Sequence, residues 1–165
     1  MDQFKVQSEL LKWLEKFVEA PNPSLGNWAP CPYARKARIN NQIKIEFIES
    51  VCRYRDSYEE ILKDYEVVIY CFDHTKISGQ DLAEWVRHEN NIIIPNNYVI
   101  LEDHPDTNEE INGVSMNFGH CGLLVVQELN RLNTASEQLK SKGYYDTWTK
   151  ENLEDVVNWR FKNGT

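Results

Sequence analysis

The stretch Val67-Val68-Ile69-Tyr70-Cys71-Phe72 is an unbroken run of apolar residues of the types that favour β-structure. A strand with one face in water alternates apolar and polar residues, whereas a strand buried on both faces does not. The run therefore predicts a central strand at residues 67–72, with the rest of a sheet arranged around it.

Three further segments have the patterns of strands. Residues 42–48 alternate apolar and polar side chains, which indicates one polar face. Residues 98–102 form a short apolar run, and residues 122–127 form another that is ambiguous between a strand and the start of a helix. The capping-box pattern Thr134-Ala135-Ser136-Glu137 predicts a helix beginning there, which favours a strand at 122–127.

Helical patterns surround these strands. An amphipathic pattern predicts a helix over 3–19 that ends before Pro21. Further helices are expected after the capping box at Ser57, from Ser78 onward, from Thr134 to Gly143, and over 149–161. Since strands and helices alternate, we expect an α/β (α+β) fold with a single mixed four-stranded sheet of ferredoxin-like size, covered by helices.

The length of 165 residues indicates one domain, spanning 1–165, with an N-terminal helix at 3–19, a core at 40–142 and a C-terminal helix at 149–161. The 103–121 connection has no regular pattern. Long connections of this kind in compact domains are often functional.

The composition limits the classes of partner. A net charge of −8 disfavours a broad nucleic-acid-binding face, and no apolar run is long enough to span a membrane. The chain begins with an amphipathic pattern rather than a secretion signal, so we expect a cytoplasmic protein whose four widely spaced cysteines are free thiols. A small molecule or a protein is the expected partner; the cofactor and the oligomeric state stay unknown.

The first candidate site is Cys31, which lies between two prolines and is followed by the basic residues Arg35, Lys36 and Arg38. Nearby cations or a helix N-terminus lower the pKa of a thiol, and a helix starting at Pro32 would make Cys31 its N-cap. This predicts a nucleophilic Cys31 with Arg35 and Arg38 as binding residues. The alternative is a small side chain that packs a proline-rich turn.

The second candidate is His104, at the end of the strand predicted at 98–102. Ligand groups in α/β folds often follow strand ends, and Asp103 or Asp106 could orient the imidazole for acid–base chemistry. The alternative is a polar turn. His120, between two glycines, is a third binding candidate. A metal site built from Cys31, His104 and His120 is chemically possible, but no ligand spacing supports it, so no metal is predicted.

Cys31 precedes the first strand and His104 follows the third. If these strands are antiparallel, both residues lie at one end of the sheet; if they are parallel, they lie at opposite ends unless the 20–41 loop runs back. We expect one shared concavity with Arg35 or Arg38 on its rim.

The pattern resembles a bacterial family of unknown function, the domain of unknown function numbered fourteen-fifteen. Members have a Cys-Pro-Phe-Ala turn, matched here by Cys31-Pro32-Tyr33-Ala34, and a strand that ends in a His-Pro pair, matched by His104-Pro105. The resemblance covers roughly residues 4–142 and departs at Gly119-His120-Cys121-Gly122, where members have an arginine-containing, proline-rich turn. It implies the fold and the place of the site, and no activity.

Two functions follow as hypotheses. One is a thiolate- or imidazole-dependent enzyme that acts on a small molecule, with Cys31 as nucleophile and His104 as acid or base. The alternative is a non-catalytic protein-binding or accessory domain that uses the acidic surface and the aromatic helix at 149–161.

Overall fold

A computed structural model describes residues 1–163 of the chain. The α-helices are α1 (Gln3–Trp13), α2 (Ala34–Ile39), α3 (Tyr58–Ile61), α4 (Gly79–Ile93), α5 (Leu129–Ser141), α6 (Lys150–Leu153) and α7 (Trp159–Asn163). The strands are β1 (Ile43–Phe47), β2 (Val67–Phe72), β3 (Tyr98–Asp103), β4 (Glu110–Ile111), β5 (Val114–Ser115) and β6 (Gly122–Glu128). Short 3₁₀ turns span Pro23–Leu25, Val51–Asp56, His74–Lys76 and Ile94–Asn96, and π-helical turns at Leu14–Val18 and Glu154–Asn158 continue α1 and join α6 to α7.

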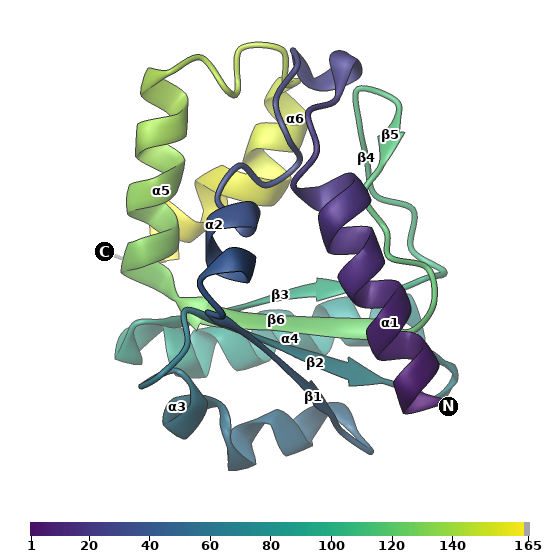
Figure 1. The fold of residues 1–165 in the computed structure, drawn as a ribbon. Helices are drawn as coiled ribbons and strands as arrows, with labels where there is room; N and C mark the ends of the chain where they lie inside the picture. Colours follow the sequence, from purple (N-terminus) through teal and green to yellow (C-terminus); the bar gives the residue numbers. More distant parts are fainter. Residues whose placement is uncertain (164–165) are drawn as a thin grey trace.

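The sheet has the strand order β1-β2-β6-β3 (Figure 1). β1 runs parallel to β2, and β6 runs antiparallel to both β2 and β3, so β1, β2 and β3 all point the same way. The predicted mixed four-stranded sheet and the central position of residues 67–72 are confirmed. The chain order of strands and helices differs from the β-α-β-β-α-β of a ferredoxin-like domain.

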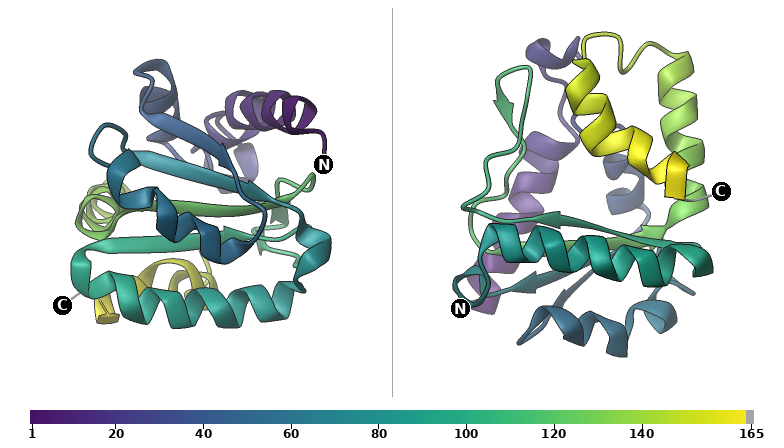
Figure 2. Two further views of the ribbon diagram at one scale, coloured as in Figure 1. Left: turned by 90° about the horizontal axis from the view of Figure 1, so that it is seen from below. Right: turned by 180° about the vertical axis from the view of Figure 1, so that it is seen from behind.

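The central strand β2 is buried because helices cover both faces of the sheet (Figures 1 and 2). Tyr70 and Phe72 belong to a core cluster with α4 and the α3 region, while Ile69 and Cys71 belong to a second cluster with α1. Alternate residues of a strand point to opposite faces, so an apolar run without polar interruptions fills both layers.

β3 forms one edge of the sheet, and its outer backbone is partly occupied by a side chain. The Asn90 amide donates to the Ile100 carbonyl at 3.0 Å and accepts from the Ile100 N–H at 2.8 Å. The Ile100 side chain belongs to the core cluster that includes α4. Its neighbour Val99 points to the opposite face of the sheet and belongs to a third cluster, against which Trp159 packs. The α4 helix and the C-terminal helices therefore flank this edge.

The start of α5 differs from the prediction. The helix begins at Leu129 rather than at Thr134, and it follows β6 without a loop. Its first N–H groups are bound by a distant residue: the Asn97 carbonyl accepts from Leu129 N at 2.9 Å, and Asn97 Oδ1 accepts from Asn130 N at 2.9 Å. This tertiary cap replaces the local capping box.

Other boundaries also differ in detail. α3 ends at Ile61, short of the expected extent, and Ser57 Oγ bonds to the Tyr70 hydroxyl at 2.8 Å instead of capping the helix. The 103–121 connection contains the small hairpin β4–β5, whose turn residues Asn112 and Gly113 both have positive φ. The helix starts at Ser78 and Thr149 are confirmed. Within residues 1–163, no helix is long and apolar enough to cross a bilayer.

Candidate functional site

His104 is held by backbone groups on both ring nitrogens. Nδ1 accepts the Asp106 N–H at 3.1 Å, so the ring proton sits on Nε2, which donates to the Ile77 carbonyl at 2.9 Å and lies 3.2 Å from the His74 carbonyl. The residue is 3% exposed. With both nitrogens engaged, this imidazole ties the end of β3 to the start of α4, and no ring nitrogen is left for a substrate.

Asp103 organises the loop that follows. Its carboxylate accepts from the Asn117 amide at 2.7 Å and from the Phe118 N–H at 3.0 Å. Burial raises the pKa of Asp103, although these two hydrogen bonds lower it. The loop also packs tightly at Gly79, where a Cβ would overlap the Thr107 side chain. The predicted binding residue Asp106 contributes its backbone N–H here, and its side chain is exposed.

Cys31 lies in the turn before α2, where its N–H donates to the Val18 carbonyl at 2.9 Å. Because α2 begins at Ala34, Cys31 is not the N-cap of a helix starting at Pro32. The residue is exposed, yet the protein around its sulfur desolvates the thiol and raises its pKa, against the opposing effect of the Tyr33 and Ala34 N–H groups. Arg38 binds Glu19 in a bidentate ion pair, with distances of 2.9 and 2.7 Å.

Cys31 and His104 do not have the geometry expected for one site. Their strands β1 and β3 are parallel, so the condition for a common sheet end is not met. The α1 N-terminus lies near the carboxyl ends of the parallel strands (Figure 1), and Cys31 binds Val18 at the other end of that helical segment. Neither of the two cavities described below is lined by Cys31 or His104.

His120 is separate from both. Its side chain is 50% exposed, with Nε2 3.9 Å from a carboxylate oxygen of Glu9. Among residues 1–163, no group of three or more His, Cys, Asp or Glu side chains is arranged to hold a metal ion, so the alternative trio of Cys31, His104 and His120 is not assembled.

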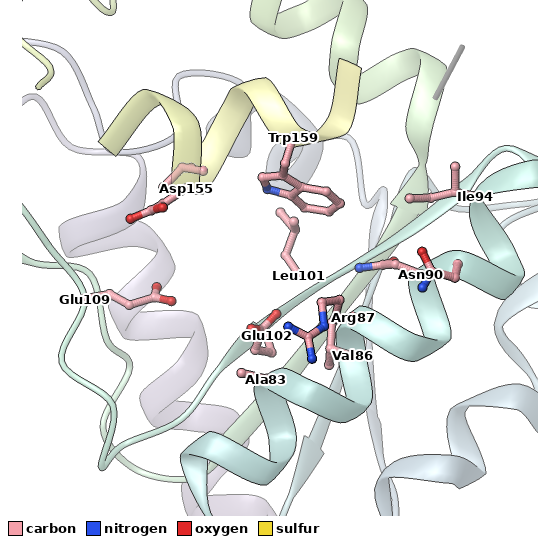
Figure 3. Close-up of a pocket in the computed structure, with 12 residues that line it drawn as sticks. Ala83, Val86, Arg87, Asn90, Ile94, Leu101, Glu102, Glu109, Asp155 and Trp159 are labelled. Carbon is pink, nitrogen blue, oxygen red and sulfur yellow. The ribbon is translucent and has the colours of Figure 1, made fainter. Parts of the chain in front are cut away.

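A cavity of about 350 Å³ lies at the β3 edge, between α4, the β4 segment and the C-terminal helices (Figure 3). Three carboxylates line it, Glu102 from β3, Glu109 from the loop before β4, and Asp155 from the C-terminal helical segment. The remaining lining residues are Ala83, Val86, Arg87, Asn90, Asn91, Ile94, Leu101, Val156 and Trp159. The cavity therefore combines an apolar wall with acidic groups that come from distant parts of the sequence.

Two of these carboxylates, Glu109 and Glu102, are electrostatically coupled. Burial raises the pKa of Glu109 to about 7, with further upward contributions from the charges of Glu102 and Asp103. Glu109 is exposed as a residue, but its carboxyl is turned into the cavity toward Glu102 (Figure 3), where protein replaces water. Burial also raises the pKa of Glu102, and the Arg87 guanidinium projects beside it (Figure 3).

This cavity was not predicted from the sequence. Glu102 lies in the Leu101–Asp106 stretch that drew attention to His104, and Trp159 lies in the helix proposed as a partner surface. The sequence feature that could have indicated the cavity is the group of carboxylates at and after the end of β3. Asp155 and Trp159 lie beside these carboxylates only because the C-terminal helices pack on β3, which no local pattern predicts.

Comparison of the chain with protein-family models, with curated proteins and with solved structures found no match. The resemblance to the family numbered fourteen-fifteen therefore stays a prediction.

Proposed function

We propose that this protein binds a small organic cation, such as a diamine, in the cavity at the β3 edge. The observation that carries the proposal is the convergence of Glu102, Glu109 and Asp155 on one cavity with an indole in its wall. A volume of about 350 Å³ suits a small ligand. The Cys31–His104 enzyme hypothesis has no comparable support, because neither residue lines this cavity.

The charges favour a cation over an anion. Arg87, which projects beside Glu102 (Figure 3), is the one cationic side chain among the lining residues, against the three carboxylates of Glu102, Glu109 and Asp155. An ammonium group accepts no hydrogen bonds and donates up to three, so it satisfies carboxylates that otherwise repel one another. The Trp159 ring supplies an apolar and cation-attracting surface.

The test is calorimetric titration with 1,4-diaminobutane at pH 8, with succinate as an anionic ligand of similar length. We expect the diamine to bind and succinate not to bind. Glu109→Gln and Asp155→Asn should each weaken diamine binding by about tenfold or more, the usual cost of losing a charge-assisted hydrogen bond.

The matched control is Glu110→Gln. Glu110 is the exposed neighbour of Glu109 and lies outside the cavity lining. Its replacement by Gln removes the same charge from the chain as Glu109→Gln does. Equal weakening by Glu109→Gln and Glu110→Gln would mean that net charge alone attracts the amine. That result, or no binding by the wild-type protein, would contradict the proposal.

A further inference from the structure

A second cavity, of about 360 Å³, lies at the carboxyl end of β2, where β6 begins and the N-terminus of α1 approaches. Asp73 and His74 line it from the end of β2, and His120 and Cys121 line it from the start of β6. This cavity places a thiol beside two imidazoles, in a part of the molecule remote from the proposed amine site.

The strand register places a second thiol next to Cys121. Gly122 pairs with Phe72 and Leu123 with Cys71, so Cys121 extends β6 at a position diagonal to Cys71. Position 121 is two residues from the partner of Cys71, so the Cys71 and Cys121 side chains point to the same face of the sheet. Both lie in the core cluster beneath α1. The neighbouring Cys121 raises the pKa of the Cys71 thiol, and burial adds to that shift. Diagonal neighbours on one face of an antiparallel pair lie about 7–8 Å apart, so a disulfide between them requires the backbone to move closer.

The two sulfurs differ in access. Cys71 is 0% exposed and lies inside β2, whereas Cys121 is 1% exposed but forms part of the cavity wall. Cys121 also lies just outside β6, in a bend, so the backbone movement that a disulfide requires would fall outside the paired part of β6.

We propose that Cys71 and Cys121 are an oxidisable dithiol, in which hydrogen peroxide entering this cavity oxidises Cys121 and Cys71 then completes a disulfide. In the first step, the Cys121 sulfur attacks one peroxide oxygen and the O–O bond breaks, giving a sulfenic acid and water. In the second, the Cys71 sulfur attacks the Cys121 sulfur and the S–O bond breaks, releasing a second water. The two thiols supply both electrons, and His74 and His120 border the cavity as proton acceptors.

The test uses a Cys31→Ser, Cys52→Ser double variant of the full chain, because Cys31 and Cys52 are the two exposed cysteines and their removal leaves the core pair intact. The folded variant is treated with hydrogen peroxide, with near-ultraviolet circular dichroism recorded throughout, and is then unfolded, alkylated and analysed by mass spectrometry. We expect loss of both alkylation sites, a cross-linked peptide pair joining residues 71 and 121, and reversal by dithiothreitol.

Two further variants in the same background test the order of the steps. Cys71→Ala should leave a sulfenic acid on Cys121 that dimedone traps, and Cys121→Ala should leave Cys71 reduced because peroxide does not reach it. Both thiols remaining free in the folded double variant, or a disulfide forming only after the dichroism signal of the fold is lost, would overturn the proposal. Since the double variant carries the main result, the proposal stays testable if either alanine variant fails to fold.

Discussion

Arg160 is buried without an acidic partner among the residues that the structure describes. It is 3% exposed, and one guanidinium nitrogen donates to Ser136 Oγ at 2.9 Å. Its Nε and Nη1 groups have no hydrogen-bond partner, and neither has Oδ1 of Asn133, one helical turn before Ser136. Burial lowers the pKa of Arg160, because desolvation disfavours the charged guanidinium, and the neighbouring Tyr145 opposes that shift only in part.

Replacing Arg160 by Met should stabilise the protein. A buried charge that lacks a counter-charge costs free energy, and well-packed apolar replacements of buried ionic groups stabilise proteins by about 1–4 kcal/mol in favourable cases. The Ser136 hydroxyl can then bond to a carbonyl of its own helix. The measurement is the free energy of unfolding in urea for wild type, Arg160→Met and Arg160→Lys. Lys retains the charge and should not stabilise; a lower stability of the Met variant would show that the guanidinium has a partner in solution.

At the scale of elements, α5 depends on Asn97, which lies just before β3. Asn97 has a φ of 70°, in the left-handed region, and caps α5 with both its carbonyl and its side chain. Two variants separate these contributions. Asn97→Gly keeps the backbone conformation and loses the side-chain hydrogen bond to Asn130 N, at a cost of about 0.5–1.5 kcal/mol. Asn97→Ala also pays for the left-handed conformation, about a further 1 kcal/mol.

Unfolding in urea should therefore rank wild type above Asn97→Gly and Asn97→Gly above Asn97→Ala. Asn96→Ala is the matched control, since Asn96 is exposed and caps nothing in the structure. Equal stability of the wild type and the glycine variant would mean that the Asn97 side chain does not hold the α5 N-terminus.

The same contact explains which elements can be predicted from the sequence. The strand at 67–72 and the helix start at Ser78 are encoded by neighbouring residues, and both are confirmed. The start of α5 is set by Asn97 across the fold, so the local pattern at Thr134 was misleading. The Asn112-Gly113 pair, in contrast, is a local hairpin signal that was available and overlooked.

For the candidate sites, the sequence indicates residue types but not their partners. His104 has the chemistry of an acid or base, and its backbone hydrogen bonds show a structural role that no motif predicts. Asp155 and Glu109 are unremarkable acidic residues until the C-terminal helices pack at the β3 edge. Cys31 and His104 were placed together on the assumption of antiparallel strands, and β1 and β3 are parallel.

At the scale of the whole molecule, ionisation of the cavity carboxylates couples stability to pH. A carboxyl whose pKa is higher in the folded chain than in the unfolded chain binds more protons when folded, so stability falls as pH rises between the two values. The pKa of Glu109 rises from its usual value of 4.5 to about 7 in the folded chain, and the pKa of Glu102 shifts in the same direction. Glu19 and Glu89 have lowered pKa values, so their stabilising effect is lost at pH values below this window.

The melting temperature of the ligand-free protein should therefore fall between about pH 5 and pH 8, and Glu109→Gln should reduce that fall. Glu110→Gln should leave it unchanged, since Glu110 lies outside the cavity lining.

Diamine binding should reverse this pH dependence. The ammonium groups of 1,4-diaminobutane stay protonated across this range, so their best acceptor is the ionised form of Glu109, which dominates above about pH 7. A fixed diamine concentration should therefore raise the melting temperature more at pH 8 than at pH 6, and binding near pH 7 should release protons to the buffer. Calorimetry in two buffers of different ionisation enthalpy measures that release. Asp155, Glu102 and Arg87 face the same cavity, so proton release that persists in Glu109→Gln would assign the titration to one of them and not to Glu109.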